Sequence, residues 1–94
     1  MSELDALLAE LRGLPPTRPS DAHDLETLLA KVKSAAGRWA DVLYEVQDSA
    51  RSLAGPRTSA ALETACRRAE ESYVELEFAL ADCGGQRGRR SQGR

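Results

Sequence analysis

The strongest hydrophobic pattern in the chain lies between Asp21 and Ala54. Its apolar positions recur in alternating steps of three and four residues, interrupted only at Ser49. They are Leu25, Leu28, Val32, Ala35, Trp39, Val42, Val46 and Leu53. This heptad pattern predicts one long helix over residues 21–54. A second apolar row of Leu29, Ala36, Leu43 and Ala50 widens the stripe to about three residues in seven, the width of a bundle-core face.

The middle of this helix is the predicted centre of the core. Residues 34–36 are small and directly precede Gly37 and Trp39, and small side chains let a second helix approach closely. We therefore expect Trp39 to fill the space beside the helix crossing. The other core positions predicted on this helix are Leu25, Leu28, Val32, Val42 and Val46. Gly37 is assigned to the outer face, where glycine lowers helix stability.

The segment 53–59, Leu-Ala-Gly-Pro-Arg-Thr-Ser, is the clearest break in the pattern. Gly55 is suited to end a helix in the left-handed conformation, Pro56 prevents its continuation, and Thr58 or Ser59 is suited to cap the next helix. We expect that helix over residues 58–83, antiparallel to the first because the turn is short. Its core positions are Leu62, Tyr73, Leu76 and Leu80, on a seam that includes Cys66, Ala69 and Cys83. Gly84 and Gly85 are expected to end it.

A short amphipathic helix is predicted at the N-terminus, within residues 1–13. Ser2 and Asp5 form a capping pair, the four leucines Leu4, Leu7, Leu8 and Leu11 make one ridge, and Gly13 follows the helix. A helix of about ten residues is marginal alone, so it needs a groove in this chain or in a partner. Three prolines make residues 14–20 a stiff, extended linker.

Residues 3–11, Glu-Leu-Asp-Ala-Leu-Leu-Ala-Glu-Leu, resemble the LD motif of the paxillin family, whose pattern is L-D-x-L-L-x-x-L. The resemblance implies docking into a groove on a helical-bundle partner. Leu4, Leu7, Leu8 and Leu11 would then be the anchors and Asp5 the charged contact. It covers about a tenth of the chain, and the Cys and His pairs of that family's LIM domains are absent. Packing of this helix within its own chain is the alternative.

Two long antiparallel helices leave part of each apolar face uncovered, because ~15 Å of N-terminal helix cannot cover a ~50 Å partner. Oligomerisation is therefore expected to complete the bundle. Val74 and Phe78 form an i, i+4 pair nearly opposite the main seam of their helix, and Tyr44 lies away from the seam of the long helix. A second apolar surface of this kind indicates an interface. Tyr44, Val74 and Phe78 are the predicted contacts between subunits.

Charge is unevenly distributed in this chain of 94 residues. Residues 1–83 hold all 15 acidic side chains and nine of the 13 basic ones, a net charge of −6. The remaining four are Arg87, Arg89, Arg90 and Arg94, in a Gly-rich tail over residues 84–94 that is expected to be disordered. The acidic body argues against a reader of duplex nucleic acid. The tail remains a candidate for weak, non-specific contact with polyanions.

No constellation for catalysis, a metal or a cofactor is recognisable. His23 is the only histidine, and no glycine-rich phosphate loop is present. Cys66 and Cys83 are seventeen positions apart, hence ~25 Å apart on one helix, too far to form a disulfide. Neither a signal peptide nor a membrane span is recognisable. The sequence therefore predicts a cytoplasmic protein that is not an enzyme.

These observations predict an all-α fold, an antiparallel helical hairpin with a short N-terminal helix. The predicted function is a non-enzymatic protein–protein interaction module, an assembly subunit, adaptor or chaperone-like cover that acts through apolar helix faces. Its partner would be a second copy or another helical protein. One alternative is a nucleic-acid-associated accessory protein that uses the arginine tail. Another is a regulator that docks its LD-like helix into a partner's groove.

Overall fold

The computed structural model describes the backbone of residues 2–92 and the side chains of residues 2–85. It contains the helices α1 (Glu3–Arg12), α2 (Ala22–Leu53) and α3 (Pro56–Gln92). No strand occurs between residues 2 and 92, and the predicted all-α class is confirmed.

The first two helices begin as the sequence predicts. The hydroxyl of Ser2 accepts a hydrogen bond from the Asp5 amide at 3.1 Å, and the Asp5 carboxylate accepts one from the Ser2 amide at 3.4 Å. Together they form a capping box. At α2, the Asp21 carboxylate accepts from the Asp24 amide at 2.8 Å. Both helix starts are therefore fixed by side chains within three residues of the cap.

The turn between α2 and α3 differs from the prediction. Ala54, with extended backbone, caps the end of α2, and Gly55 does not have a positive φ. The next helix begins at Pro56 and not at Thr58. Proline suits the first turn because the N–H groups there have no acceptor within the helix, so the N–H that proline lacks costs no hydrogen bond. In the first backbone hydrogen bond of the new helix, Ser59 N donates to Gly55 O at 3.1 Å.

The end of α3 is a second correction. This helix continues to Gln92, nine residues beyond the predicted end at Cys83, so most of the predicted tail is helical. Neither Gly84 nor Gly85 has a positive φ, and without a following proline a glycine pair costs only about 1 kcal/mol per residue relative to alanine. The side chains of Arg87, Arg89, Arg90 and Arg94 lie outside the described residues.

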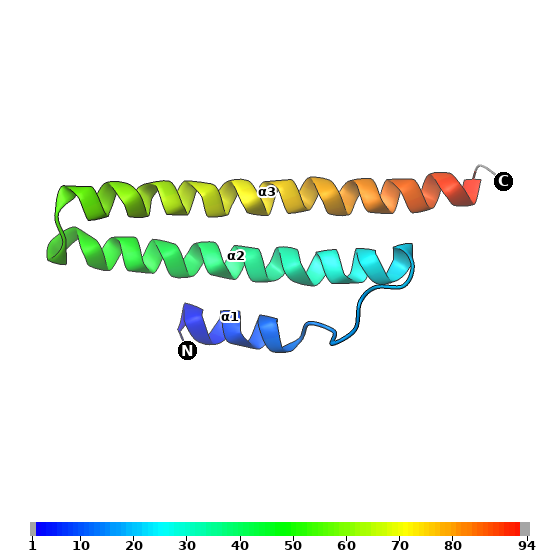
Figure 1. Ribbon diagram of the computed structural model, residues 1–94, viewed down its shortest axis with the longest axis horizontal. Helices are drawn as coiled ribbons and strands as arrows, with labels where there is room; N and C mark the ends of the chain where they lie inside the picture. Colours follow the sequence, from blue (N-terminus) through cyan, green and yellow to red (C-terminus); the bar gives the residue numbers. More distant parts are fainter. Residues whose placement is uncertain (1, 93–94) are drawn as a thin grey trace.

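In space, α2 lies between the other two helices (Figure 1). On one side α3 runs back along α2. The contacting pairs, each with its α2 residue first, are Gln47 and Cys66, Gly37 and Tyr73, Lys33 and Glu77, and Ala22 and Cys83. On the other side α1 is tied to α2 by Arg38 to Glu3 at 3.9 Å and by Lys31 to the Gly13 carbonyl at 3.2 Å. Within the described residues, no Cα of α1 lies within 8 Å of a Cα of α3. The three helices form an open row, which we call the layer.

The interior of this layer is small. The buried apolar residues among those described are Leu7, Ala35, Ala40, Cys66 and Ala69. The predicted core positions Leu28, Val32, Val42, Leu62, Tyr73, Leu76 and Leu80 are only half-buried. Three further core predictions are wrong for the single chain, because Leu25 and Val46 are exposed and Trp39 is 48% exposed. The cause is the row arrangement, in which α1 and α3 flank α2 on opposite sides and the part of the heptad seam that carries Leu25 and Trp39 points out between them.

Candidate interaction surface

The contacts between helices fix which way each side of α2 points. Ala22, Lys33, Gly37 and Gln47 lie toward α3, whereas Lys31 and Arg38 lie toward α1. Successive helical residues are rotated by about 100°, so Leu25, Val32 and Trp39 point out of the layer between those two directions. They define one open side of the molecule.

The same argument assigns the flanks of the neighbouring helices. Ser34 and Asp41 of α2 line a hollow together with Glu70 and Val74 of α3, so these residues share one side of the layer. The opposite flank of α3 therefore shares its side with the α2 seam. In α1, Leu7 is buried and Glu10 shares a hollow with Lys31. Because these two residues fix the rotation of α1, the other leucines of this helix lie on the seam side. We call this side the seam face; it comprises Leu4, Leu8, Leu11, Leu25, Val32, Trp39, Leu43, Val46, Ala61, Ala65, Ser72, Leu76 and Ala79.

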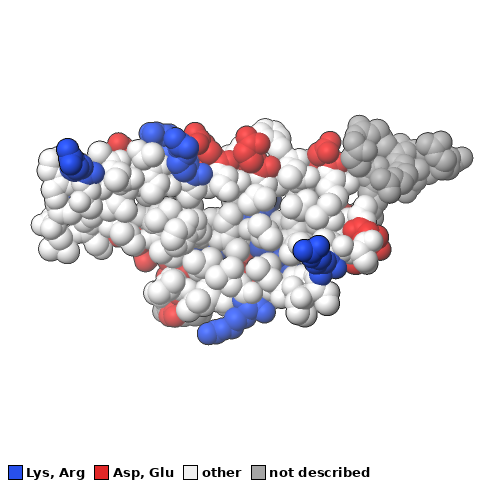
Figure 2. Space-filling model, in the orientation of Figure 1, with Lys and Arg blue, Asp and Glu red and all other residues white. Residues whose placement is uncertain are grey.

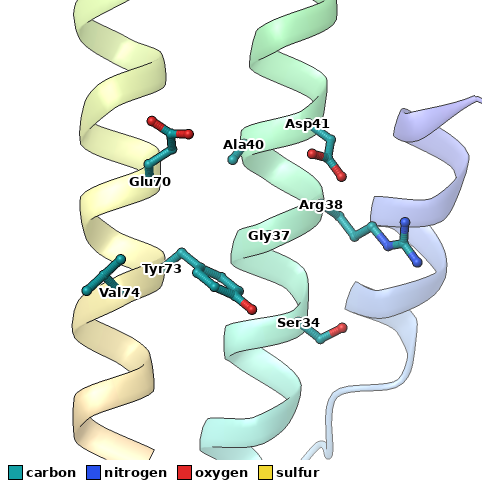
Figure 3. Close-up of a pocket in the computed structure, with 8 residues that line it drawn as sticks. All are labelled: Ser34, Gly37, Arg38, Ala40, Asp41, Glu70, Tyr73 and Val74. Carbon is teal, nitrogen blue, oxygen red and sulfur yellow. The ribbon is translucent and has the colours of Figure 1, made fainter.

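The seam face is almost uncharged. Figure 2 looks onto the layer from the side opposite to that of Figure 3; uncharged side chains, in white, cover most of its middle, where a few basic side chains show, and most acidic side chains lie toward the margins. Along this face the heptad positions of α2 carry no charge, and Arg68 stands at the α3 margin. Six large apolar side chains on it are exposed: Leu4, Leu8, Leu11, Leu25, Trp39 and Val46. An uncharged apolar surface of this extent is typical of an interaction site.

The opposite side carries a hollow of ≈ 490 Å³ around Tyr73. Figure 3 shows the Tyr73 ring extending from α3 toward α2 at Gly37. A Cβ added to Gly37 would lie 3.2 Å from Tyr73 Cε1, so Gly37 faces α3, and its predicted place on the outer face is wrong. The Lys33 ammonium lies 5.6 Å from the Tyr73 ring centroid and 3.8 Å from a Glu77 oxygen. Gly37 and Tyr73 in the wall of the hollow therefore pack α2 against α3.

The predicted subunit contacts Tyr44, Val74 and Phe78 are all exposed, and Val74 lines the hollow of Figure 3. Acidic groups lie beside two of them: hydrogen bonding of the Tyr44 hydroxyl to the Glu70 carboxylate raises the pKa of that tyrosine, and Val74 shares a further hollow with Glu70, Glu71, Glu75 and Arg67. The apolar groups on this side are therefore interspersed with carboxylates, unlike those of the seam face.

The leucine ridge of α1 is divided by the fold. Leu7 is buried against α2, whereas Leu4, Leu8 and Leu11 remain exposed. Asp5, the charged contact implied by the LD resemblance, is in the capping box. α1 thus packs within its own chain through Leu7 and contributes its other leucines to the seam face.

The two cysteines are free thiols. Cys66 Sγ donates to Gln47 Oε1 at 3.5 Å, and Cys83 Sγ donates to the Ala22 carbonyl at 3.7 Å. Burial raises the pKa of the Cys66 thiol, which keeps it protonated and unreactive at neutral pH. Among the described residues, no three His, Cys, Asp or Glu side chains are grouped so that they could hold a metal ion.

Sequence reasoning missed the polar contacts that tie the helices together. Lys31, Lys33 and Arg38 all belong to α2 and reach α1 or α3 from the edges of the heptad seam. Their signal was present in the sequence as charged positions flanking the apolar stripe, where interhelical ion pairs are common. The pattern alone did not indicate which neighbour each one would meet.

Comparison with known proteins returned no match among protein-family models, curated proteins or solved structures. None of the helices in the described part of the chain combines the length and apolar character needed to cross a membrane.

Proposed function

We propose that this chain is a non-enzymatic, cytoplasmic interaction module that binds helices through its seam face. In this proposal the α2–α3 pair acts as a helical hairpin and α1 widens its apolar side. The single observation that carries the proposal is the seam face itself. It extends over all three helices, and it leaves six large apolar side chains exposed on a chain whose described residues bury only one leucine.

Physical chemistry supports a binding role for such a face. Apolar area removed from water contributes about 25 cal/mol per Å². Trp39 lies near the middle of α2, and tryptophan is enriched among the residues that dominate binding energy at interfaces. Half of this side chain is still exposed and is available to a partner. The function that fits is an assembly subunit, an adaptor or a chaperone-like cover.

Site-specific photo-crosslinking tests this function. Benzoylphenylalanine replaces Trp39 on the seam face or, as a control, Glu71, an exposed residue that points away from α2. We expect the probe at position 39 to give adducts of discrete mass in a cell extract. Excess unlabelled Val74→Glu chain should compete with them, and excess Val46→Glu chain should not, because Val46 is on the seam face. No adduct from position 39, or the same adducts from both probes, would contradict the proposal.

A further inference from the structure

We infer that the seam face binds a second copy of this chain, face to face, with a two-fold axis parallel to α2. This inference rests on the proposed function and names its partner. Four observations carry it: the excess surface of the single chain, its small core, the shape of the seam face, and the position of Arg68 at the margin of that face.

The single chain exposes more surface than a finished monomer of its size. Its accessible surface is 6804 Å² for a mass of 10.2 kDa, whereas folded monomers of this mass expose roughly 5,300 Å². Its radius of gyration is 16.9 Å, compared with about 12 Å for a compact domain of this length. The excess of roughly 1,500 Å² exceeds the ~800 Å² that each partner of a standard interface buries. One further copy, burying an interface of standard size, would cover about half of this excess.

The core also needs a partner. No large side chain among the described residues is fully buried, and α1 has ten residues against the 32 of α2. Beyond the reach of α1, Val46 stays exposed and Leu53 is 85% exposed. A second copy would supply the missing layer, and the two seam faces together would form the apolar centre of a six-helix bundle.

The seam face is complementary to itself in shape. On one side of the α2 seam it has the leucine ridge of α1, and on the other side it has the small α3 residues Ala65, Ser72 and Ala79. A two-fold axis along α2 places the α1 ridge of each copy over the small residues of its partner's α3, so that large side chains meet small ones. An axis across the helices would oppose ridge to ridge and small residues to small residues. The pattern therefore favours the parallel arrangement.

Charge is consistent with the same axis. In the α2–α3 register, where Gly37 meets Tyr73, Arg68 lies level with residues 42–43 of α2. The N-terminus of α1 lies near Arg38, which Glu3 contacts. The proposed axis preserves position along α2, so Arg68 of each copy would lie ~6 Å along the axis from the acidic first turn of the partner's α1. This offset brings the Arg68 guanidinium to about the level of the partner's α1 first turn, which carries Glu3 and Asp5.

A matched pair of variants tests the inference. Val46 on the seam face and Val74 on the opposite side are 45% and 43% exposed, and both lie inside a helix. Val46→Glu should raise the dimer dissociation constant at least ~100-fold, because a carboxylate would be buried in an apolar interface. Val74→Glu should leave it within about threefold. Sedimentation equilibrium under reducing conditions measures both, and circular dichroism confirms that each variant is helical.

Orientation is tested by a single cysteine at Ala50, a half-buried α2 position on the seam side, in a Cys66→Ala/Cys83→Ala background. The parallel axis brings position 50 next to its own counterpart, so a short bismaleimide should link two chains. An antiparallel α2 pair would separate these positions by roughly 35 Å and give no link. Absence of the link in a dimeric sample would overturn the proposed axis.

The failure of this inference is distinguishable from failure of the proposed function. A wild-type chain that stays monomeric at 100 μM, or a dimer lost on Val74→Glu and kept on Val46→Glu, would overturn the second-copy inference. The proposed function would then still stand if the probe at Trp39 captured another protein in competition with the Val74→Glu chain. It would fall if that probe captured nothing.

Discussion

The continuation of α3 through Gly84 and Gly85 predicts that alanine at both positions stabilises the chain, whereas a helix that ended at Cys83 would be destabilised by the same change. A Cβ added to Gly85 meets nothing within 4 Å, and one added to Gly84 would lie 3.0 Å from Glu26 Oε2, the mobile end of a long side chain. Alanine at position 85 therefore fits the observed helix freely, and alanine at position 84 fits once the Glu26 carboxylate shifts by a few tenths of an ångström. In the alternative structure, in which the helix ends at Cys83 with a left-handed glycine, the same change introduces strain.

The magnitude follows from helix propensity. Alanine is favoured over glycine inside a helix by about 1 kcal/mol per residue, and positions near a helix end contribute less than that. We expect the Gly84→Ala/Gly85→Ala variant to gain about 1 kcal/mol in free energy of unfolding. In a chain of 60–100 residues, about 1 kcal/mol shifts Tm by roughly 4–8 °C. A left-handed glycine replaced by alanine would instead lower stability by about 1–2 kcal/mol.

Thermal unfolding followed by circular dichroism at 222 nm measures this shift. Wild type and variant must be compared at one protein concentration, because assembly makes Tm depend on concentration. Gly85→Pro serves as the opposing variant: inside a helix proline costs about 3 kcal/mol, whereas just past a helix end it is tolerated. A lower Tm for the alanine variant, together with an unchanged Tm for Gly85→Pro, would refute a continuous α3.

Three further predictions concern the packing of the layer. Gly37→Val should lower Tm more than Gly37→Ala, because even the alanine Cβ would lie 3.2 Å from Tyr73 Cε1; equal effects would mean that the ring moves freely. Leu7→Ala should cost about 2–3 kcal/mol and expose the α1 amides to hydrogen exchange, whereas Leu8→Ala, at an exposed position, should change little. Burial raises the pKa of the Cys66 thiol above its ordinary value of 9.0. The unfolded chain therefore loses the thiol proton more readily than the folded chain. The contribution of the protonated Cys66 thiol to stability is complete below pH 9.0 and is lost as the pH rises through the pKa of the folded state. Cys66→Ala should remove this part of the stability loss at alkaline pH, measured by urea titration.

The existence of the helices and the starts of α1 and α2 were predictable because local physics determines them. The capping box of Ser2 and Asp5 and the Asp21 cap need only neighbours within three residues. The heptad spacing of α2 predicted a long helix over nearly the observed residues. These features depend on backbone hydrogen bonds and periodicity, which a sequence displays directly.

Which side of α2 each neighbouring helix packs against was not predictable, because it depends on where helices distant in the sequence dock. Trp39 was expected in the core, yet α3 packs against the row that contains Ala22, Gly37 and Gln47, and α1 packs on the other flank. Gly37 was the available signal, since a glycine inside a long helix often marks a close approach of another element. Similarly, Gly84 was read as a helix stop although glycine weakens a helix without ending it.

In the proposed dimer, each chain buries its seam face against that of a second copy. Multi-angle light scattering on the intact protein, with reductant present to prevent intermolecular disulfides, tests it most directly. We expect an absolute mass of about twice 10.2 kDa in the micromolar range, falling toward the mass of one chain on dilution. A single-chain mass at all concentrations up to 100 μM, with native helicity, would contradict it.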